Sequence, residues 1–244
     1  MSDTALTDRQ KAILKMVIDE YISTAEPISS GYLTKKYKLN VSAATIRNEM
    51  AVLIRRGYLD QPHTSAGRVP TPAGYRLYIR ELMGNTSLPV LKEVAMKQNV
   101  WSNRYDPHSL LRSASSALAS ATNLLSLVSL NDGSLYYSGV VNILDYIEFF
   151  DIEVSRAVLN MLDSYENSLY TFLEKRNTSD TCVIMGDEFE RSSLYPVSVV
   201  AKSFVSGGKK GHVCVIGPAR MKYQEVIPAV DYMAHILEEL GVTW

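Results

Sequence analysis

The sequence has only two cysteines and four histidines in 244 residues. Cys182 and Cys214 lack CxxC spacing, so we expect reduced thiols, with a disulfide as the minor alternative. The histidines do not fall at metal-ligand spacing, and no Gly-rich phosphate loop, nucleophile elbow or HExxH motif is present. We therefore expect no catalytic residue, no metal site and no cofactor, as in a protein that is not an enzyme.

Long apolar runs are also missing. No stretch reaches the length that spans a membrane, and the N-terminal MSDTALTDRQ lacks the basic start and apolar stretch of a signal peptide. We therefore expect a cytoplasmic protein without membrane contact. The hydrophobic content of 46% is enough for two compact domains in a chain of this length.

The most informative segment runs from Leu39 to Arg80. Ser42 can cap a helix that continues to about Arg56 and ends before Gly57. Apolar residues at helical spacing form its core face, which comprises Ile46, Met50 and Leu53. The opposite face is small, polar and basic, with Ala44, Arg47, Asn48, Ala51 and Arg55. Such a face can enter a major groove, where Arg and Asn reach base edges or phosphates.

A hairpin, or wing, is predicted directly after this helix. Residues 58–61 alternate like a strand, residues 62–67 are turn-rich, and residues 68–70 return as a second short strand. Thr71 and Pro72 then start a further helix. The hairpin carries groups that commonly contact phosphates, at His63, Thr64, Ser65 and Arg68.

Two more helices are predicted upstream. The first is a capped amphipathic helix that stops before Pro27, and the second runs from Ser29 or Ser30 through Tyr37. Residues 28–80 hold nine Lys or Arg and two acidic residues, a net charge of +7 in a chain whose total is −1. This confined basic field predicts a winged helix-turn-helix that binds double-stranded DNA. The candidate DNA-binding residues are Lys35, Lys36, Ser42, Ala43, Ala44, Thr45, Arg47, Asn48, Arg55, His63, Thr64, Ser65 and Arg68.

The domain pattern predicts a DNA-binding domain at residues 1–83, a linker at 84–108 and an α+β domain at 109–244. In the α+β domain, the helix at 109–123 is rich in alanine and serine. This composition favours close packing inside the domain, and a contact in a dimer is the secondary interpretation. Strands are expected at 124–130, 182–185, 195–205 and 212–216, and a final helix at 223–240. Residues 140–175 are expected to be mainly helical, with one apolar stripe of Ile143, Ile147, Phe150, Val154, Val158, Met161 and Leu162.

Several blocks of the sequence also match a known family. The chain resembles the heat-inducible transcription repressors of the HrcA family in several blocks. In the N-terminal part they are LTDRQKAIL, SAATIRNEMAVL, GYLDQPHTSAGRVPT and GYRLYI. Further on they are GHVCVIGPARMKYQEVIPAVDYMAHIL at 211–237 and, more weakly, LYYSGVVNILDYIEF at 135–149. The resemblance implies a bacterial repressor that binds an inverted-repeat operator ahead of chaperone genes as a homodimer. It also implies support of activity by the GroE-type chaperonin and a GAF-like C-terminal fold.

One departure from the family pattern affects the expected dimer. HrcA proteins usually carry an extra region with an inserted dimerising domain between the equivalents of Leu130 and Leu135, whereas this chain has a tight Asn-Asp-Gly turn there. We therefore expect a reduced GAF-like domain and a dimer built from it and the helix at 109–123.

Two alternatives remain open at this point. Control by a small molecule, sensed through the C-terminal domain, is the alternative to control by the chaperonin. The turn at Gly217–Met221 places Arg220 near a helix start, where an anion can bind. A structural role is the expected one for this turn.

Overall fold

The structure is a computed structural model that describes residues 5–84, 86–176 and 178–241. It divides into two compact units, Met1–Asn85 and Thr86–Trp244, each described by itself below. Among the described residues, no helix is both long enough and apolar enough to cross a membrane.

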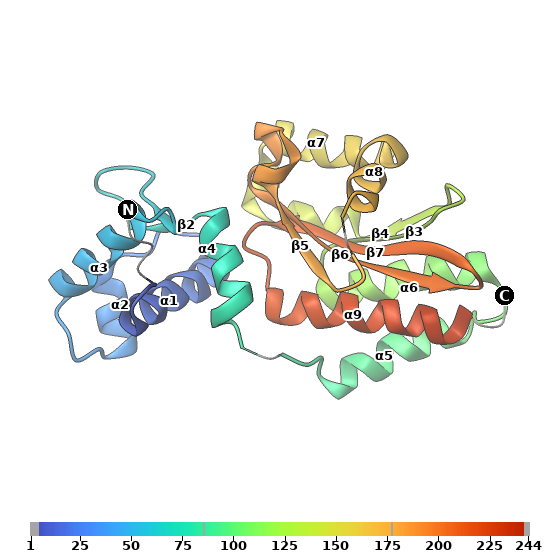
Figure 1. The fold of residues 1–244 in the computed structure, drawn as a ribbon, viewed down its shortest axis with the longest axis horizontal. Helices are drawn as coiled ribbons and strands as arrows, with labels where there is room; N and C mark the ends of the chain where they lie inside the picture. The colour runs from blue at the N-terminus through green and yellow to red at the C-terminus, as the bar shows by residue number, and fades with distance from the viewer. Residues whose placement is uncertain (1–4, 85, 177, 242–244) are drawn as a thin grey trace. The chain divides into compact units, whose positions relative to one another are not determined.

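The N-terminal unit is a winged helix-turn-helix, as predicted (Figure 1). A capping box between Thr7 and Gln10 starts the first helix, and Ser42 caps the third through a bond from the Thr45 N–H. The expected core face of the third helix is buried. The elements are α1 (Asp8–Thr24), α2 (Ser30–Tyr37), α3 (Ala43–Arg55), β1 (Leu59–Asp60), β2 (Val69–Pro70), α4 (Pro72–Leu77) and the π-helix η1 (Tyr78–Leu82).

The C-terminal unit is an α+β domain built on one antiparallel sheet with the order β4-β3-β7-β6-β5. Helices α5, α6 and α9 lie on one face of the sheet, and α7 and α8 lie on the other (Figure 1). This arrangement confirms the predicted α+β class. The principal elements are α5 (Val90–Trp101), α6 (Pro107–Thr122), β3 (Leu125–Leu130), β4 (Leu135–Ser138), α7 (Ile152–Asp163), α8 (Leu169–Glu174), β5 (Cys182–Met185), β6 (Val197–Ser206), β7 (Lys209–Pro218) and α9 (Tyr223–Leu240).

Shorter 3₁₀ helices complete this unit. They are η2 (Val140–Asp145), η3 (Ile147–Phe150), η4 (Tyr165–Asn167), η5 (Gly186–Phe189) and η6 (Ser192–Leu194).

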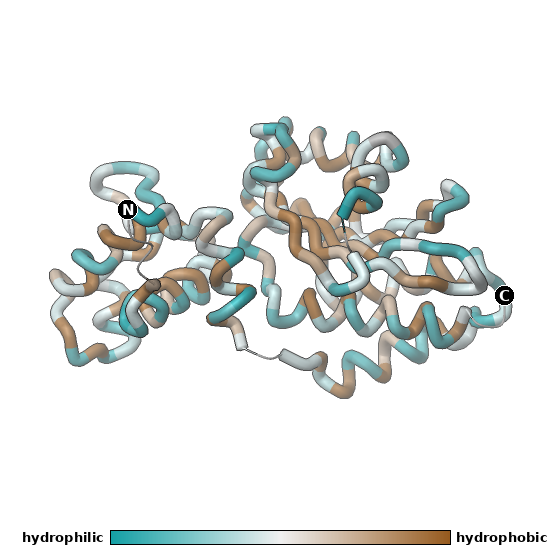
Figure 2. The backbone as a smooth tube through the Cα atoms, viewed as in Figure 1, coloured by the Kyte–Doolittle hydropathy of each residue, from teal (hydrophilic) through white to brown (hydrophobic). Residues whose placement is uncertain are grey.

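Burial on both faces explains why the central strands β3 and β7 are strongly apolar. Every residue of β3 is buried, and the strands are among the most hydrophobic parts of the chain (Figure 2). β6 and β7 meet at Gly207 and Gly208, which have φ values of 58° and 77°. Positive φ at both central residues is the conformation of the type I′ turn that joins tightly twisted strands.

The segment at 84–108, predicted to be a linker with a helical turn or two at 91–100, contains the 12-residue helix α5. Met96 and Val100 of α5 are buried, and Lys92 Nζ lies 2.7 Å from Glu225 Oε2 on α9. Seven of the twelve residues of α5 are apolar, and packing against α6 and α9 makes this helix part of the domain.

The predicted dimer contact on the helix at 109–123 is also corrected. The small residues of α6 are buried inside their own domain, with Ala114 and Ser115 fully buried and Ala117 and Ala119 nearly so. The alanines allow α6 to approach the sheet and α9 closely, so this face is not available to a second chain.

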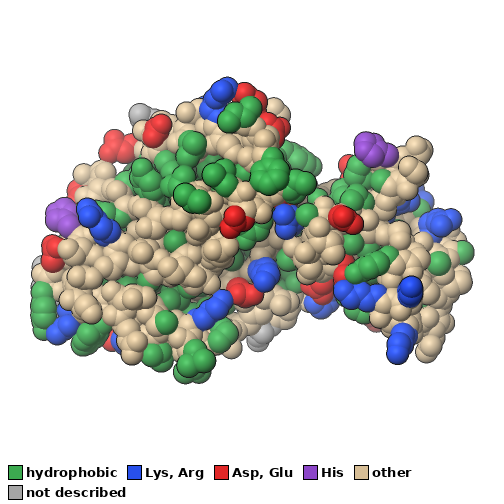
Figure 3. Space-filling model, turned by 180° about the vertical axis from the view of Figure 1, so that it is seen from behind, with side chains coloured by type: hydrophobic (Ala, Val, Ile, Leu, Met, Phe, Trp, Pro, Cys, Tyr) green, Lys and Arg blue, Asp and Glu red, His purple; other side chains and the backbone are tan. Residues whose placement is uncertain are grey.

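The apolar stripe predicted across residues 143–162 is wrong at two positions. Ile147 and Phe150 are 61% and 72% exposed, whereas the other members of the stripe are buried. The reason is local geometry: residues 140–150 form the 3₁₀ helices η2 and η3, so every third side chain aligns rather than those of an α-helical stripe. Hydrophobic side chains are accordingly visible on the surface of this unit (Figure 3).

Burial of His212 predicts a pH-dependent stability of the C-terminal unit. The ring is fully buried in β7, its Nε2 lies 3.5 Å from Glu174 Oε1, and neither ring nitrogen has a hydrogen-bond partner among the described residues. Burial lowers the pKa of His212 to about 4, although the Glu174 carboxylate acts in the opposite direction. The folded protein therefore binds this proton less well than the unfolded chain.

Between pH 6.5 and 4, we expect His212 to destabilise the folded state increasingly as the pH falls, by up to about 3 kcal/mol. In His212→Leu this part of the pH dependence should vanish in urea unfolding curves. His235→Gln, which changes an exposed histidine of α9, is the matched control and should keep the wild-type profile. An unchanged profile in His212→Leu would contradict this prediction.

Candidate nucleic-acid interface

The exposed face of α3 carries most of the predicted recognition residues. Ala44, Arg47, Asn48 and Arg55 are exposed, while Ile46, Met50 and Leu53 point into the core. Ser42 and Thr45 serve the cap of this helix, since Ser42 Oγ accepts the Thr45 N–H at 3.1 Å. The structure therefore presents a short-side-chain, basic surface of the kind that can approach a groove closely.

The wing is held by three backbone pairings. β1 and β2 pair at Leu59–Pro70 and Asp60–Val69, and a further antiparallel bridge joins Arg68 to Ile28, just before α2. Gly67 is required there, because a Cβ at this position would lie 2.5 Å from the Pro27 carbonyl. The predicted wing residues His63, Thr64 and Ser65 are exposed at its tip.

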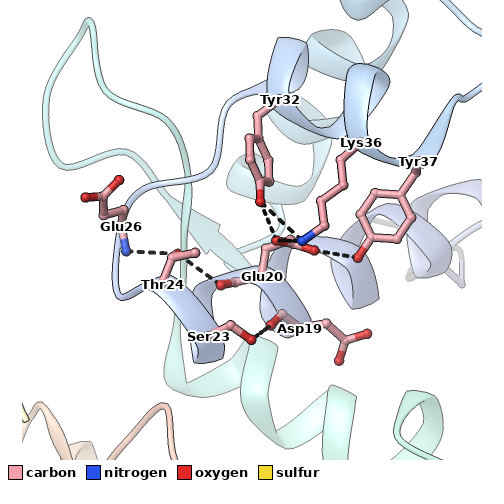
Figure 4. Close-up of polar contacts among 8 residues, drawn as sticks. All are labelled: Asp19, Glu20, Ser23, Thr24, Glu26, Tyr32, Lys36 and Tyr37. Atoms are coloured by element: carbon pink, nitrogen blue, oxygen red, sulfur yellow. Dashed lines mark hydrogen bonds and ion pairs between the residues drawn. The ribbon is translucent and has the colours of Figure 1, made fainter.

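A buried carboxylate fixes α2 on α1 (Figure 4). Glu20 of α1 has a side chain only 5% exposed and accepts bonds from Tyr32 Oη at 2.7 Å, Lys36 Nζ at 2.7 Å and Tyr37 Oη at 2.8 Å. Burial disfavours its charge, but these hydrogen bonds outweigh burial and hold the pKa of Glu20 below its ordinary value. Sequence periodicity gives no signal for this cluster, because its members lie up to 17 residues apart.

One predicted DNA contact, Lys36, also belongs to this cluster. Lys36 pairs with Glu20 and helps to position α2 while half of its side chain stays exposed, and Lys35 beside it is also exposed. Burial followed by the Glu20 carboxylate raises the pKa of Tyr37 to about 12, so its hydroxyl stays a donor at neutral pH. One carboxylate of α1 thus accepts hydrogen bonds from three side chains of α2.

The turn at Gly217–Met221 has a structural partner. Arg220 and Glu148 form a bidentate ion pair, with Nε 2.6 Å from Oε1 and Nη2 3.1 Å from Oε2, and both side chains are largely buried. The guanidinium joins the start of α9 to η3 in this way, as the expected structural role of the turn requires.

The comparisons with known proteins agree with this architecture. The family model described as the HrcA protein C terminal domain matches residues 76–227. The chain belongs to the HrcA family. The match covers more than half of the sequence, and it includes the sheet domain rather than only the widespread winged helix.

Relatives in the HrcA family are named heat-inducible transcription repressors. One from Acetivibrio thermocellus is 25% identical over 336 aligned positions that cover 96% of each chain, and one from Synechococcus elongatus is 43% identical over 162 residues, 66% of this chain and 44% of its own. A crystal structure titled only as a hypothetical protein has a TM-score of 0.79 at 20% identity and covers 98% of this chain and 99% of its own. That structure shares the fold.

The alignment also shows that this HrcA chain is a short member of the family. The Acetivibrio alignment runs over 336 positions, whereas this chain has 244 residues, so at least 92 positions of the relative have no counterpart here (336 minus 244). The absence of the usual inserted region was predicted from the Asn-Asp-Gly turn, which the structure forms between β3 and β4.

Removal of the Glu20 charge tests the cluster that positions α2. In Glu20→Gln we expect the free energy of unfolding of the N-terminal unit to fall by about 2 kcal/mol at pH 7, because charge-assisted bonds are lost. The folded pKa is depressed, so the wild-type advantage is present above pH 4.5 and lost as the pH falls through the folded pKa. Urea unfolding at several pH values, with hydrogen exchange in α2, measures the loss of unfolding free energy and its pH dependence.

Glu26→Gln is the control for this variant, because Glu26 is an exposed carboxylate near the end of α1. It should retain wild-type stability. Equal stability of the two variants at pH 7 would show that the cluster contributes no net stabilisation.

Proposed function

We propose that this HrcA-family protein is a sequence-specific DNA-binding repressor of chaperone genes, which acts on an inverted-repeat operator in the bacterial cytoplasm. The observation that carries the proposal is the exposed basic face of α3, set beside a rigidly paired wing in a segment with a net charge of +7. Phosphates hold such a module by charge, and base edges supply specificity.

The proposed roles follow from exposure and chemistry. Asn48, with Ala44 beside it on α3, faces the base edges, since an amide can pair with both N6 and N7 of adenine. Lys35 and Arg55 contact phosphates. His63, Thr64 and Ser65 at the wing tip follow the backbone, while Ser42, Ala43 and Thr45 present the capped start of α3 to it.

We infer that the protein binds as a dimer, because one winged module reads too few base pairs to select a site in a genome. The interface we propose is an apolar surface, defined as Val141, Leu144, Ile147, Phe150 and Ile152, all at least half exposed. In a 3₁₀ helix residues i and i+3 align, so the pairs in η2 and in η3 each share one side. A contiguous set of this kind is rare on a surface that stays in water.

We propose that the GroE-type chaperonin modulates the repressor, as the family resemblance implies. The small-molecule alternative is favoured by a cavity of about 460 Å³ between α7, α8 and η5. Apolar Met161, Leu169 and Phe172 line it together with Lys175 and Arg191, a composition and size that suit a small ligand. Operator affinity with and without purified chaperonin separates the two, because a ligand-controlled repressor would not respond to the chaperonin.

Asn48→Ala tests base recognition. We expect operator affinity to fall by about 1–3 kcal/mol while affinity for random duplex of equal length is unchanged, because only base readout is lost. Fluorescence anisotropy on the two duplexes measures this. An equal loss on both would assign Asn48 to the backbone and remove α3 as the reader of sequence.

Phe150→Glu tests the dimer. A buried charge at the apolar surface should convert the chain to a monomer at micromolar concentration and abolish cooperative operator binding, while half-site affinity is retained. Sedimentation measures the mass. The control is Leu91→Glu on α5, where the native side chain is 84% exposed outside the apolar surface. A monomeric control and a dimeric Phe150→Glu protein would refute the proposed interface.

A further inference from the structure

A cavity of about 380 Å³ lies between the wing, α3 and the start of α2. Its walls include the guanidinium-bearing residues Arg47 and Arg68 and the hydroxyl-bearing residues Ser29, Thr64 and Ser65. None of the residues that line it is acidic. The cavity therefore combines two cations with hydroxyl donors and holds no anion of the protein's own.

The side chain and backbone of Arg68 are held in place at this cavity by hydrogen bonds. Its Nη1 donates to the Ala66 carbonyl at 2.9 Å, and its Nε is buried without a hydrogen-bond partner among the described residues. The backbone of Arg68 is fixed as well, by the pair of hydrogen bonds of 2.9 and 2.8 Å that it exchanges with Ile28. An N–H donor is thus held in place with nothing to donate to, which is costly unless a ligand accepts the bond.

The electrostatics point the same way. Burial, and then the nearby positive charge of Arg47, lower the pKa of Arg68. Two like charges at one cavity repel each other, and an anion between them would remove that repulsion. The amino end of α2, capped by Ser29, lies at the wall and adds a partial positive charge.

We propose that this cavity binds a single phosphate group and that Arg47 and Arg68 clamp it from α3 and the wing. The inference rests on the proposed function, in which duplex DNA supplies the phosphate; free inorganic phosphate is the other source of the same chemistry. Planar guanidinium groups suit phosphate because they donate two parallel bonds. Arg47 is then a positioning contact, and sequence reading is left to the neighbouring positions of α3.

The test uses the full chain with Arg47→Ala, Arg68→Ala and the double variant. Each single variant should lose about tenfold in affinity for operator and for random duplex alike. The double variant should lose less than the product of the two, because both side chains hold the same phosphate. Arg80→Ala, which removes an exposed charge paired with Glu81 elsewhere in the module, is the control and should change both affinities less than twofold.

Replacing operator phosphates one at a time with neutral methylphosphonate identifies the bound group. One replacement per half-site should weaken the wild-type complex about tenfold and leave the double variant unaffected. A loss on operator alone in Arg47→Ala, or equal sensitivity of wild-type and double variant to every replacement, would overturn the clamp.

Inorganic phosphate, compared with chloride at equal ionic strength, separates the two sources. If inorganic phosphate does not compete specifically with DNA, the DNA backbone is the source of the bound phosphate. If it does compete, and the competition is lost in the double variant, free phosphate is a ligand of the same cavity. If the wild-type chain bound no duplex DNA, the proposed function would fail. Titration calorimetry with inorganic phosphate would then test the clamp by itself. Binding of phosphate to the wild-type chain that is lost in the double variant would support the clamp, and no binding to the wild-type chain would overturn it.

Discussion

The antiparallel bridge between Ile28 and Arg68 is the constraint on which the geometry of the N-terminal unit depends. It joins the wing to the chain just before α2, so the hairpin cannot swing independently of the helices. Gly67 makes the bridge sterically feasible, since any Cβ there would overlap the backbone at Pro27. Arg68 faces the same cavity as Arg47 because of this single pairing.

Electrostatics organise this unit from both sides of α2. Where α2 packs on α1, the Glu20 carboxylate accepts hydrogen bonds from two tyrosines and Lys36, and its charge offsets that of Lys36. On the outer side, the cavity beside the wing has two guanidinium-bearing residues and no acidic one. The unit thus pairs a cation where α1 and α2 pack and leaves two guanidinium-bearing residues without an acidic neighbour at the cavity, where we propose that a phosphate binds.

The C-terminal unit shows how a short family member keeps its fold. The Asn-Asp-Gly turn closes the β3–β4 hairpin directly, and the five-stranded sheet remains covered by helices on both faces. The region that relatives carry in addition is not needed to bury this core. The apolar surface along η2 and η3 is exposed, whereas every residue of the central strand β3 is buried.

Local signals in the sequence were sufficient for much of the structure. Caps at Thr7, Ser29 and Ser42 and the spacing of Ile46, Met50 and Leu53 act within a few residues, so they predicted the winged helix and its exposed face. Strands β3, β5, β6 and β7 followed from short apolar runs between turns. Periodicity misled at Ile147 and Phe150, because it assumes an α-helix and the chain there turns with three residues per turn.

What the sequence determined alone was therefore the type of the long elements other than α5, the family, and the set of residues on the exposed face of α3. The tertiary structure alone decided that Lys36 pairs with Glu20, that the small face of α6 is buried against its own sheet, and that Arg47 and Arg68 share a cavity. Each of these depends on residues distant in the chain coming together. Pairing across such distances is set by packing and burial of the whole domain, which leave no periodic trace in the sequence.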